Sequence, residues 1–248
     1  MDKTSLGDRM KGYEAVSQTI LMKRTPVIIS VDGRAFHTFT KRLTDVDKSP
    51  FSNTMSDCME SAAVYLTHYI QGAVLSYVQS DEISVLLRDW ETFETQQWFG
   101  GKVQKVVSMA SAMASTAFYA RYETYEQIDY MAHRPLFDAR VFSLPKEEVT
   151  NYFIWRQQDA MRNSVNMFGQ FHYSANQLHG KKVDQVKEML LAKGLDWDKL
   201  PAWEQRGFCV PQKYSFSSAM ERADLDTPIF TEDRDYIERW LDDYQGEM

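Results

Sequence analysis

Between residues 26 and 145, apolar runs typical of strands alternate with longer segments in which apolar residues recur at helical spacing. We predict strands at 26–31, 73–78, 83–87 and 137–144, and helices at 54–70 and 104–119. The short turn between the second and third strands predicts a β-hairpin. The resulting order, β-α-β-β-α-β, is the ferredoxin-like or split βαβ pattern. It predicts an α+β fold in which two helices back an antiparallel sheet.

The chain after Pro145 has a helical pattern. We predict helices at 147–174, 183–193 and 232–244, with Gly194 as the C-terminal cap of the second one. At the start of the 54–70 helix, the run Thr54-Met55-Ser56-Asp57 resembles a capping box. The sequence therefore predicts one domain over 1–248, with a sheet core at about 20–146 and a helical extension at about 147–248.

The 248-residue chain has a formal net charge of −7, and this charge is unevenly distributed. Residues 195–248 hold 13 acidic and 6 basic residues, whereas the acidic and basic residues of 1–194 balance at 22 each. This excludes a strongly basic nucleic-acid-binding protein but allows local basic patches. The chain has only two cysteines, a polar N-terminus and no apolar run of the roughly 20 residues that a membrane span needs. We expect a cytoplasmic protein with reduced thiols that does not bind membranes.

Two carboxylates stand at the ends of predicted strands. Asp32 follows the first strand, and Asp81 lies in the turn of the hairpin. In a ferredoxin-like sheet these elements are neighbours, so the two aspartates are expected side by side, where they repel each other unless a cation or a proton intervenes. Mg²⁺ suits this place because it takes oxygen ligands and is shared with substrate phosphates. The alternatives are an ordinary Asp-Gly turn and a solvated hairpin tip.

The chain contains four motifs in this order: VDGRAFHTFT at 31–40, QSDEIS at 79–84, FDARVFSLP at 137–145 and YFIWRQQDAMRNSVN at 152–166. Together they resemble the tRNA-His guanylyltransferase family of 3′–5′ polymerases, and the resemblance covers roughly residues 5–185. It implies a polymerase-type palm for the sheet core, and an enzyme that adds nucleotides to the 5′ end of tRNA. It also implies that Asp32, the backbone carbonyl of Gly33 and Asp81 bind two Mg²⁺ ions, with Glu82 as the acidic neighbour in the catalytic motif.

The same resemblance implies further contacts. Those to the incoming GTP come from Asp32, Gly33, Arg34, Ala35, Phe36, His37, Ser80 and Asp81. Lys48 matches a lysine that reaches a triphosphate, and Lys102 and Lys105 match basic positions that face tRNA. Arg156, Asp159 and Asn163 share one face of a helix, where they either form a buried polar network or contact substrate. Asn163 is therefore a third candidate for RNA binding.

The resemblance implies a reaction in which ATP activates the 5′-monophosphate of tRNA, the 3′-hydroxyl of GTP attacks it, and pyrophosphate leaves last. The eukaryotic branch carries a His-Ile-Asn-Asn-Leu-Tyr-Asn motif where this chain has residues 160–166, and an arginine where it has Ser30. Here the chain looks like the bacterial, archaeal and phage guanylyltransferase-like proteins. Resemblance to that group implies templated repair of 5′-truncated tRNA. Resemblance to the family as a whole implies a homotetramer built as a dimer of dimers.

Two other functions are compatible with the pattern. A palm-fold nucleotidyl cyclase would share the aspartate pair, but its hairpin carries a Gly-Gly-Asp-type turn, which Ser80-Asp81-Glu82 does not match. A non-catalytic RNA-binding protein would have lost the metal site, whereas Asp32 and Asp81 are both present.

Overall fold

The computed structural model describes residues 5–36, 39–41, 47–125, 134–212 and 223–242. The sheet core consists of β1 (Val27–Gly33), α3 (Asn53–Tyr69), β2 (Ala73–Gln79), β3 (Glu82–Leu87), α4 (Val103–Tyr122) and β4 (Phe137–Ser143). This is the predicted order of strands and helices. The second half contains α5 (Lys146–His172), α6 (Ala175–Leu178), α7 (Val183–Leu191), α8 (Ala202–Arg206), β5 (Phe208–Pro211) and α9 (Asp235–Glu238).

The strands form one antiparallel sheet in the order β4-β1-β3-β2-β5. The prediction of an α+β fold with an antiparallel sheet is confirmed. β5 was not predicted. It has only four residues and ends in proline, so its sequence carries too little strand pattern to detect. It pairs with β2, the strand that would otherwise form an edge.

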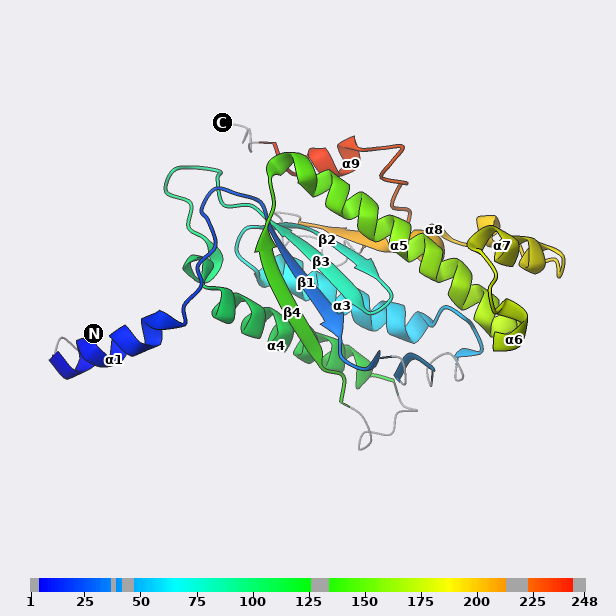
Figure 1. Cartoon of the computed structure of the whole chain (residues 1–248), viewed down its shortest axis with the longest axis horizontal. Coiled ribbons are helices and arrows are strands. Elements are labelled where there is room, and N and C mark those ends of the chain that lie inside the picture. The colour runs from blue at the N-terminus through cyan, green and yellow to red at the C-terminus, as the bar shows by residue number, and fades with distance from the viewer. Residues whose placement is uncertain (1–4, 37–38, 42–46, 126–133, 213–222, 243–248) are drawn as a thin grey trace.

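Side chains alternate between the two faces of β1, and this alternation positions the site. The odd-numbered residues Val27, Ile29 and Val31 pack in the core shared with α3 and α4. Ile28 packs on the opposite face, in the core shared with α5 and α9. Asp32 follows the same alternation, so it lies on the face of the sheet against which α5 packs. Figure 1 shows α3, α4 and α5 around the sheet.

The start of α3 and the extent of the last helix differ from the predictions. α3 begins at Asn53 because the hydroxyl of Ser52 accepts a hydrogen bond from the Met55 N–H, so the capping box expected at Thr54 is wrong. Asp57, expected in that box, instead binds Arg121 of α4. The helix expected at 232–244 is represented by the short α9, and its expected end at Tyr244 lies outside the described residues.

The long helical stretch after Pro145 is confirmed by α5, which has 27 residues. Gly194 also ends α7 as predicted. It has a φ of +77°, and the Leu195 N–H beyond it donates a hydrogen bond to the Leu190 carbonyl. Both cysteines are buried and free.

α1 (Ser5–Val16) was not predicted, and it projects away from the rest of the chain (Figure 1). It has no buried residue, and its apolar side chains Leu6, Met10, Tyr13 and Val16 are exposed. None of the described helices has the length and apolar character needed to cross a membrane.

Candidate active site

Two aspartates meet where β1 ends and the hairpin turns. Ser80 and Asp81 connect β2 to β3, and Ser80 adopts the left-handed conformation, with a φ of +49°. The Gly33 N–H donates a hydrogen bond of 3.0 Å to the Asp81 carbonyl oxygen, which holds the turn against the end of β1. Asp32 lies directly opposite Glu82, the residue that follows Asp81. The predicted juxtaposition of Asp32 and Asp81 is therefore confirmed.

The surroundings of both aspartates disfavour ionisation. Burial raises the pKa of Asp32 above its ordinary value, and the neighbouring carboxylate of Asp138 raises it further, against the opposing charges of Arg140 and Arg156. Burial also raises the pKa of Asp81, where hydrogen bonds oppose the shift and the charge of Asp32 adds to it. Carboxylates held together in this way gain stability from a bound cation.

Glu82 is already engaged by protein groups. The guanidinium of Arg156 on α5 and the amide of Gln79 both donate hydrogen bonds to the same oxygen of Glu82. Arg156 also lies 3.5 Å from Asp159, so it joins two carboxylates. Arg156 and Asp159 thus form a polar network, which is one of the two alternatives left open by the sequence, and both also line the cleft beside the carboxylates. Glu82 therefore holds this network beside Asp32, and its own carboxylate is already paired with protein groups.

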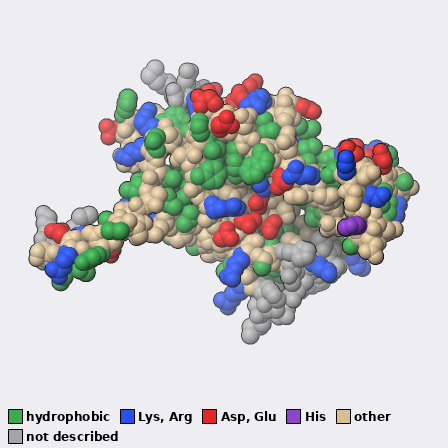
Figure 2. Space-filling view, in the orientation of Figure 1, with side chains coloured by type: hydrophobic (Ala, Val, Ile, Leu, Met, Phe, Trp, Pro, Cys, Tyr) green, Lys and Arg blue, Asp and Glu red, His purple; other side chains and the backbone are tan. Residues whose placement is uncertain are grey.

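A cleft of about 580 Å³ opens beside the carboxylates. Asp32, Asp81 and Glu82 lie on its lining, and its other walls come from the start of α3, from α5 and from α8. Figure 2 shows acidic and basic side chains gathered on the molecular surface where the sheet ends beside α5. The volume lies within the range of about 300–1,000 Å³ typical of small-molecule sites.

Polar side chains far from the carboxylates in sequence also line the cleft. Asn163, the third member of the predicted helix face, is exposed there, and Asn166 and Gln170 follow it along α5. Glu204 on α8 lines the same space, and burial raises its pKa. Sequence reasoning missed Gln79 and Glu204. Gln79 directly precedes the Ser-Asp-Glu turn, and this position could have identified it. Glu204 lies in no recognisable motif, so the sequence offers no reason to select it.

The loop after β1 presents backbone and exposed side chains rather than an aromatic surface. The Phe36 ring is buried in the core, so only its backbone can contact a nucleotide. A Cβ on Gly33 would lie 2.5 Å from that ring, which explains glycine at this position. Arg34 and Ala35 are exposed, and Ala35 has a φ of +57°. His37, a predicted nucleotide contact, lies outside the described residues.

Lys48 is exposed on the segment that leads into α3, with a φ of +50°. The residues that follow it, Pro50, Phe51 and Ser52, line the cleft. Lys48 is thus near the mouth of the cleft. Phe51 itself is buried, like Phe39 further up the chain, so both serve the core and not base stacking.

The predicted RNA contacts Lys102 and Lys105 lie at the opposite end of the sheet. They stand at the start of α4, where Val106 packs near Val27, the first residue of β1. The 20 residues of α4 span about 30 Å, so the structure does not bring these lysines to the carboxylates.

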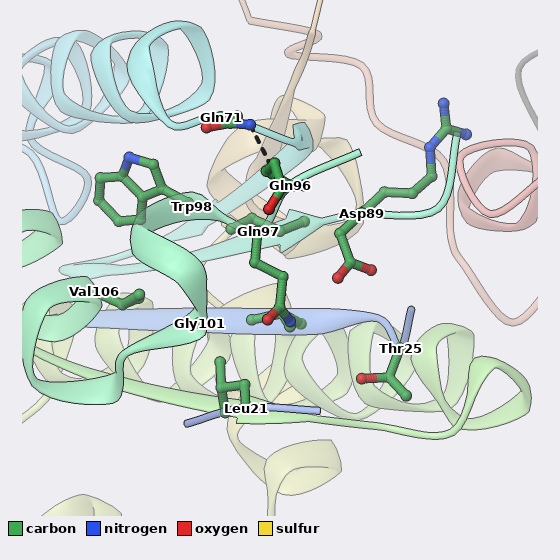
Figure 3. A pocket seen from close by; sticks show the side chains of 12 residues that line it. Leu21, Thr25, Gln71, Asp89, Gln96, Gln97, Trp98, Gly101 and Val106 are labelled. Atoms are coloured by element: carbon green, nitrogen blue, oxygen red, sulfur yellow. Dashed lines mark hydrogen bonds between the residues drawn. The ribbon is translucent and has the colours of Figure 1, made fainter. Parts of the chain in front are cut away.

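A second, much smaller pocket lies at this opposite end (Figure 3). Its volume is about 20 Å³, and it is lined by Asp89 and Gln97, each of which has a buried oxygen with no hydrogen-bond partner among the described residues. Such a space has room for about one water molecule. It is too small for a nucleotide, so the cleft beside Asp32 is the candidate active site.

The donor atoms at the cleft favour one kind of metal. The described part of the chain contains no group of three or more His, Cys, Asp or Glu side chains able to hold a metal ion. The pair Asp32 and Asp81 instead offers carboxylate oxygens, and Gly33 adds a backbone carbonyl. An oxygen set with few protein ligands fits Mg²⁺, which completes its coordination with water and substrate phosphates, and does not fit Zn²⁺.

The chain is similar to known proteins over most of its length. The model of the tRNAHis guanylyltransferase family (Thg1) matches residues 7–145. A bacterial tRNA(His) guanylyltransferase (Thg1)-like protein in complex with ATP is 38% identical, with a TM-score of 0.86, over 96% of this chain and 99% of that one. The GTP complex of a bacterial Thg1-like protein is 35% identical, with a TM-score of 0.80 and the same coverage. The probable tRNA(His) guanylyltransferase of Dictyostelium discoideum is 25% identical over 208 residues, 78% of each chain.

Proposed function

The chain belongs to the tRNAHis guanylyltransferase family, a family of nucleotidyltransferases, and from this we propose that it adds nucleotides to the 5′ end of tRNA in the 3′–5′ direction with Mg²⁺. The observation that carries the proposal is the pair Asp32 and Asp81, held side by side at one end of a large cleft. The antiparallel order β4-β1-β3-β2 supports a ferredoxin-like, polymerase-type palm as the scaffold.

Asp32, Asp81 and the carbonyl of Gly33 would hold two Mg²⁺ ions, which when bound neutralise charge on the reacting phosphates. The residues around them have distinct roles. Arg156 keeps Glu82 paired and so reduces the negative charge that faces substrate phosphates. We assign Lys48, which is exposed shortly before the cleft-lining residues Pro50 and Phe51, to the triphosphate tail.

We assign the cleft to the nucleotide substrates, ATP and GTP, because its volume suits a molecule of that size. ATP would activate the 5′-monophosphate, the 3′-hydroxyl of GTP would then attack, and pyrophosphate would leave last. Each step is an in-line displacement at phosphorus, which depends on positioning and electrostatic stabilisation more than on a protein nucleophile.

Templated repair of truncated tRNA is the activity that this chain's departures from the eukaryotic pattern favour. Ser30 stands where that branch has arginine, and it is buried in β1. Its position offers no cation to a substrate. The two bacterial proteins that match over 96% of this chain are named Thg1-like, which supports the same assignment.

The test is nucleotide addition to two labelled RNAs carrying 5′-monophosphates. One is tRNA-His without its extra 5′ guanosine, and the other is a different tRNA that lacks its first nucleotide. Extension of the second RNA, abolished in Asp81→Ala, is the expected result. Extension of tRNA-His alone would indicate tRNA-His maturation. A cyclic dinucleotide formed from GTP alone would indicate a nucleotidyl cyclase, and no extension, even of 5′-triphosphate RNA, would refute the proposed activity.

We also propose that the protein acts as a homotetramer built as a dimer of dimers. The projecting α1, with exposed Leu6, Met10 and Tyr13 close together on one face, supports a contact between subunits. Light scattering after size-exclusion chromatography should give four times the chain mass, and Met10→Asp should reduce it. A monomeric wild type would contradict this assignment.

A further inference from the structure

We propose that Trp155 stacks on the terminal base at the 5′ end of the RNA substrate and so holds that end beside Asp32. The inference rests on the proposed function, because it takes RNA as the substrate. It concerns a residue outside the cleft and a surface to which no role has been given above.

Trp155 is a large aromatic residue whose side chain is exposed to solvent. Its exposed fraction is 56%, although it lies on α5, the helix that covers one face of the sheet. The guanidinium of Arg156 lies 4.6 Å from the centre of the ring, and Tyr152 packs edge-to-face against it at 5.8 Å. These two neighbours fix the ring's orientation, and more than half of its surface still faces solvent.

The neighbours of Trp155 connect it to the catalytic aspartate. Arg156 pairs with Glu82, which lies directly opposite Asp32 in the sheet. The hydroxyl of Tyr152 is 2.9 Å from the hydroxyl of Ser84, the next residue of β3 on the same face. Trp155 is therefore linked to Glu82, the cross-strand partner of Asp32, through one cation–π contact and one ion pair.

Asp32 lies between Glu82 of β3, which lines the cleft, and Asp138 of the edge strand β4, which does not. Arg156 lines the cleft, whereas Trp155 does not. On the other side, Asp138 and Arg140 of the edge strand β4 are exposed next to β1. The reaction joins two substrates at one pair of carboxylates, so two approaches are required.

Size and charge indicate which substrate lies beside Trp155 and β4. The nucleotide is assigned to the cleft, which is lined by Asp32 and by Pro50, Phe51 and Ser52, shortly after Lys48 in the chain. The open side suits the RNA, whose duplex is too large for the cleft. Arg140 offers a cation to the RNA backbone there, and an exposed aromatic ring offers a stacking surface for any base. The stacked base is therefore the one at the RNA's 5′ end.

The test is a binding cycle that does not depend on catalysis. The dissociation constants of two 3′-labelled RNAs, identical except that one carries an abasic residue at its 5′ end, are measured by filter binding. Trp155→Ala should weaken binding of the intact RNA about 5- to 100-fold and leave the abasic RNA almost unchanged, whereas Trp155→Phe should retain most of the affinity.

Phe93→Ala is the matched control. Phe93 is 91% exposed with Arg24 4.8 Å from its ring centre, but it follows β3 at the end of the sheet opposite Asp32. The Phe93→Ala variant should bind both RNAs with the same affinity as the wild type. Equal weakening of both RNAs by Trp155→Ala, no weakening of either, or loss of the oligomeric state instead would overturn the stacking role. Because the cycle measures binding alone, failure of the extension assay would be a separate result.

Discussion

Asp81→Asn is expected to change thermal stability in opposite directions with and without Mg²⁺. In the metal-free protein, burial and the neighbouring charge of Asp32 both oppose ionisation of Asp81. Asp81 lies in the turn next to Glu82, the cross-strand partner of Asp32, and two like charges about 6 Å apart repel by about 3 kcal/mol at an effective dielectric constant of about 20. Solvent exposure of Asp32 and salt reduce this to about 1–2 kcal/mol. For a chain of this size, the variant should melt about 2–8 °C above the wild type in EDTA.

With Mg²⁺ the order should reverse. A ligand present at about 100 times its dissociation constant stabilises the folded state by about 2.7 kcal/mol, and the variant loses most of this gain because it lacks one carboxylate. Differential scanning calorimetry in EDTA and in saturating MgCl₂ measures both effects. Asp138→Asn is the control, because Asp138 also lies opposite Asp32 and repels it, but it is exposed on β4. It should keep the Mg²⁺ response.

Two results would refute this reasoning. If Mg²⁺ raised the melting temperature of Asp81→Asn as much as that of the wild type, Asp81 would not bind the ion. If the variant melted below the wild type in EDTA, repulsion between the two aspartates would not govern the metal-free state.

Four further outcomes are expected from the same site. Arg156→Met should lower the free energy of unfolding by about 3 kcal/mol in urea titrations, because it leaves the carboxylate of Glu82 without its cation, and adding Glu82→Gln should recover part of the loss. At Mg²⁺ concentrations well below its dissociation constant, the rate of nucleotide addition should fall with falling pH around a midpoint above that of ordinary aspartate, because the pKa of metal-free Asp81 is raised and only its ionised form binds a cation. The metal-free advantage of Asp81→Asn should shrink over the same fall in pH, because folded wild type takes up the proton at higher pH than the unfolded chain. Gly33→Ala should displace the Phe36 ring, cost about 1–3 kcal/mol in urea titrations and weaken GTP binding by calorimetry; unchanged stability would show that the loop adapts.

The aspartate pair could be predicted because each aspartate follows a recognisable local pattern and the predicted strand order makes the two patterns neighbours. Asp32 ends a β-branched run, and Asp81 lies in a short turn between two strands. Once the pattern predicts that the first strand neighbours the hairpin, no long-range information is needed to bring them together. The same reasoning located the long α5, whose helical spacing persists over 27 residues.

Features that depend on contacts distant in sequence were not predictable. The partner of Glu82 is Arg156, 74 residues later, and several other charged residues were equally plausible. The helix start at Asn53 depends on a serine hydroxyl, and that hydroxyl is in turn bound by Asp47. Lys102 and Lys105 were assigned to RNA by resemblance alone, which could not reveal that the start of α4 lies far from the carboxylates.

The position of β5 argues against treating the helical half as an addition to a finished catalytic core. β5 comes from residues 208–211, yet it completes the sheet by pairing with β2, the strand that leads directly into the Asp81 turn. The Tyr77 hydroxyl on β2 donates a hydrogen bond to the Arg206 carbonyl just before β5. α5 supplies Arg156 to Glu82 and one wall of the cleft. A chain ending near residue 146 would leave β2 as an open edge and Glu82 without its cation, so we interpret the core and the extension as one cooperative unit that builds a single site.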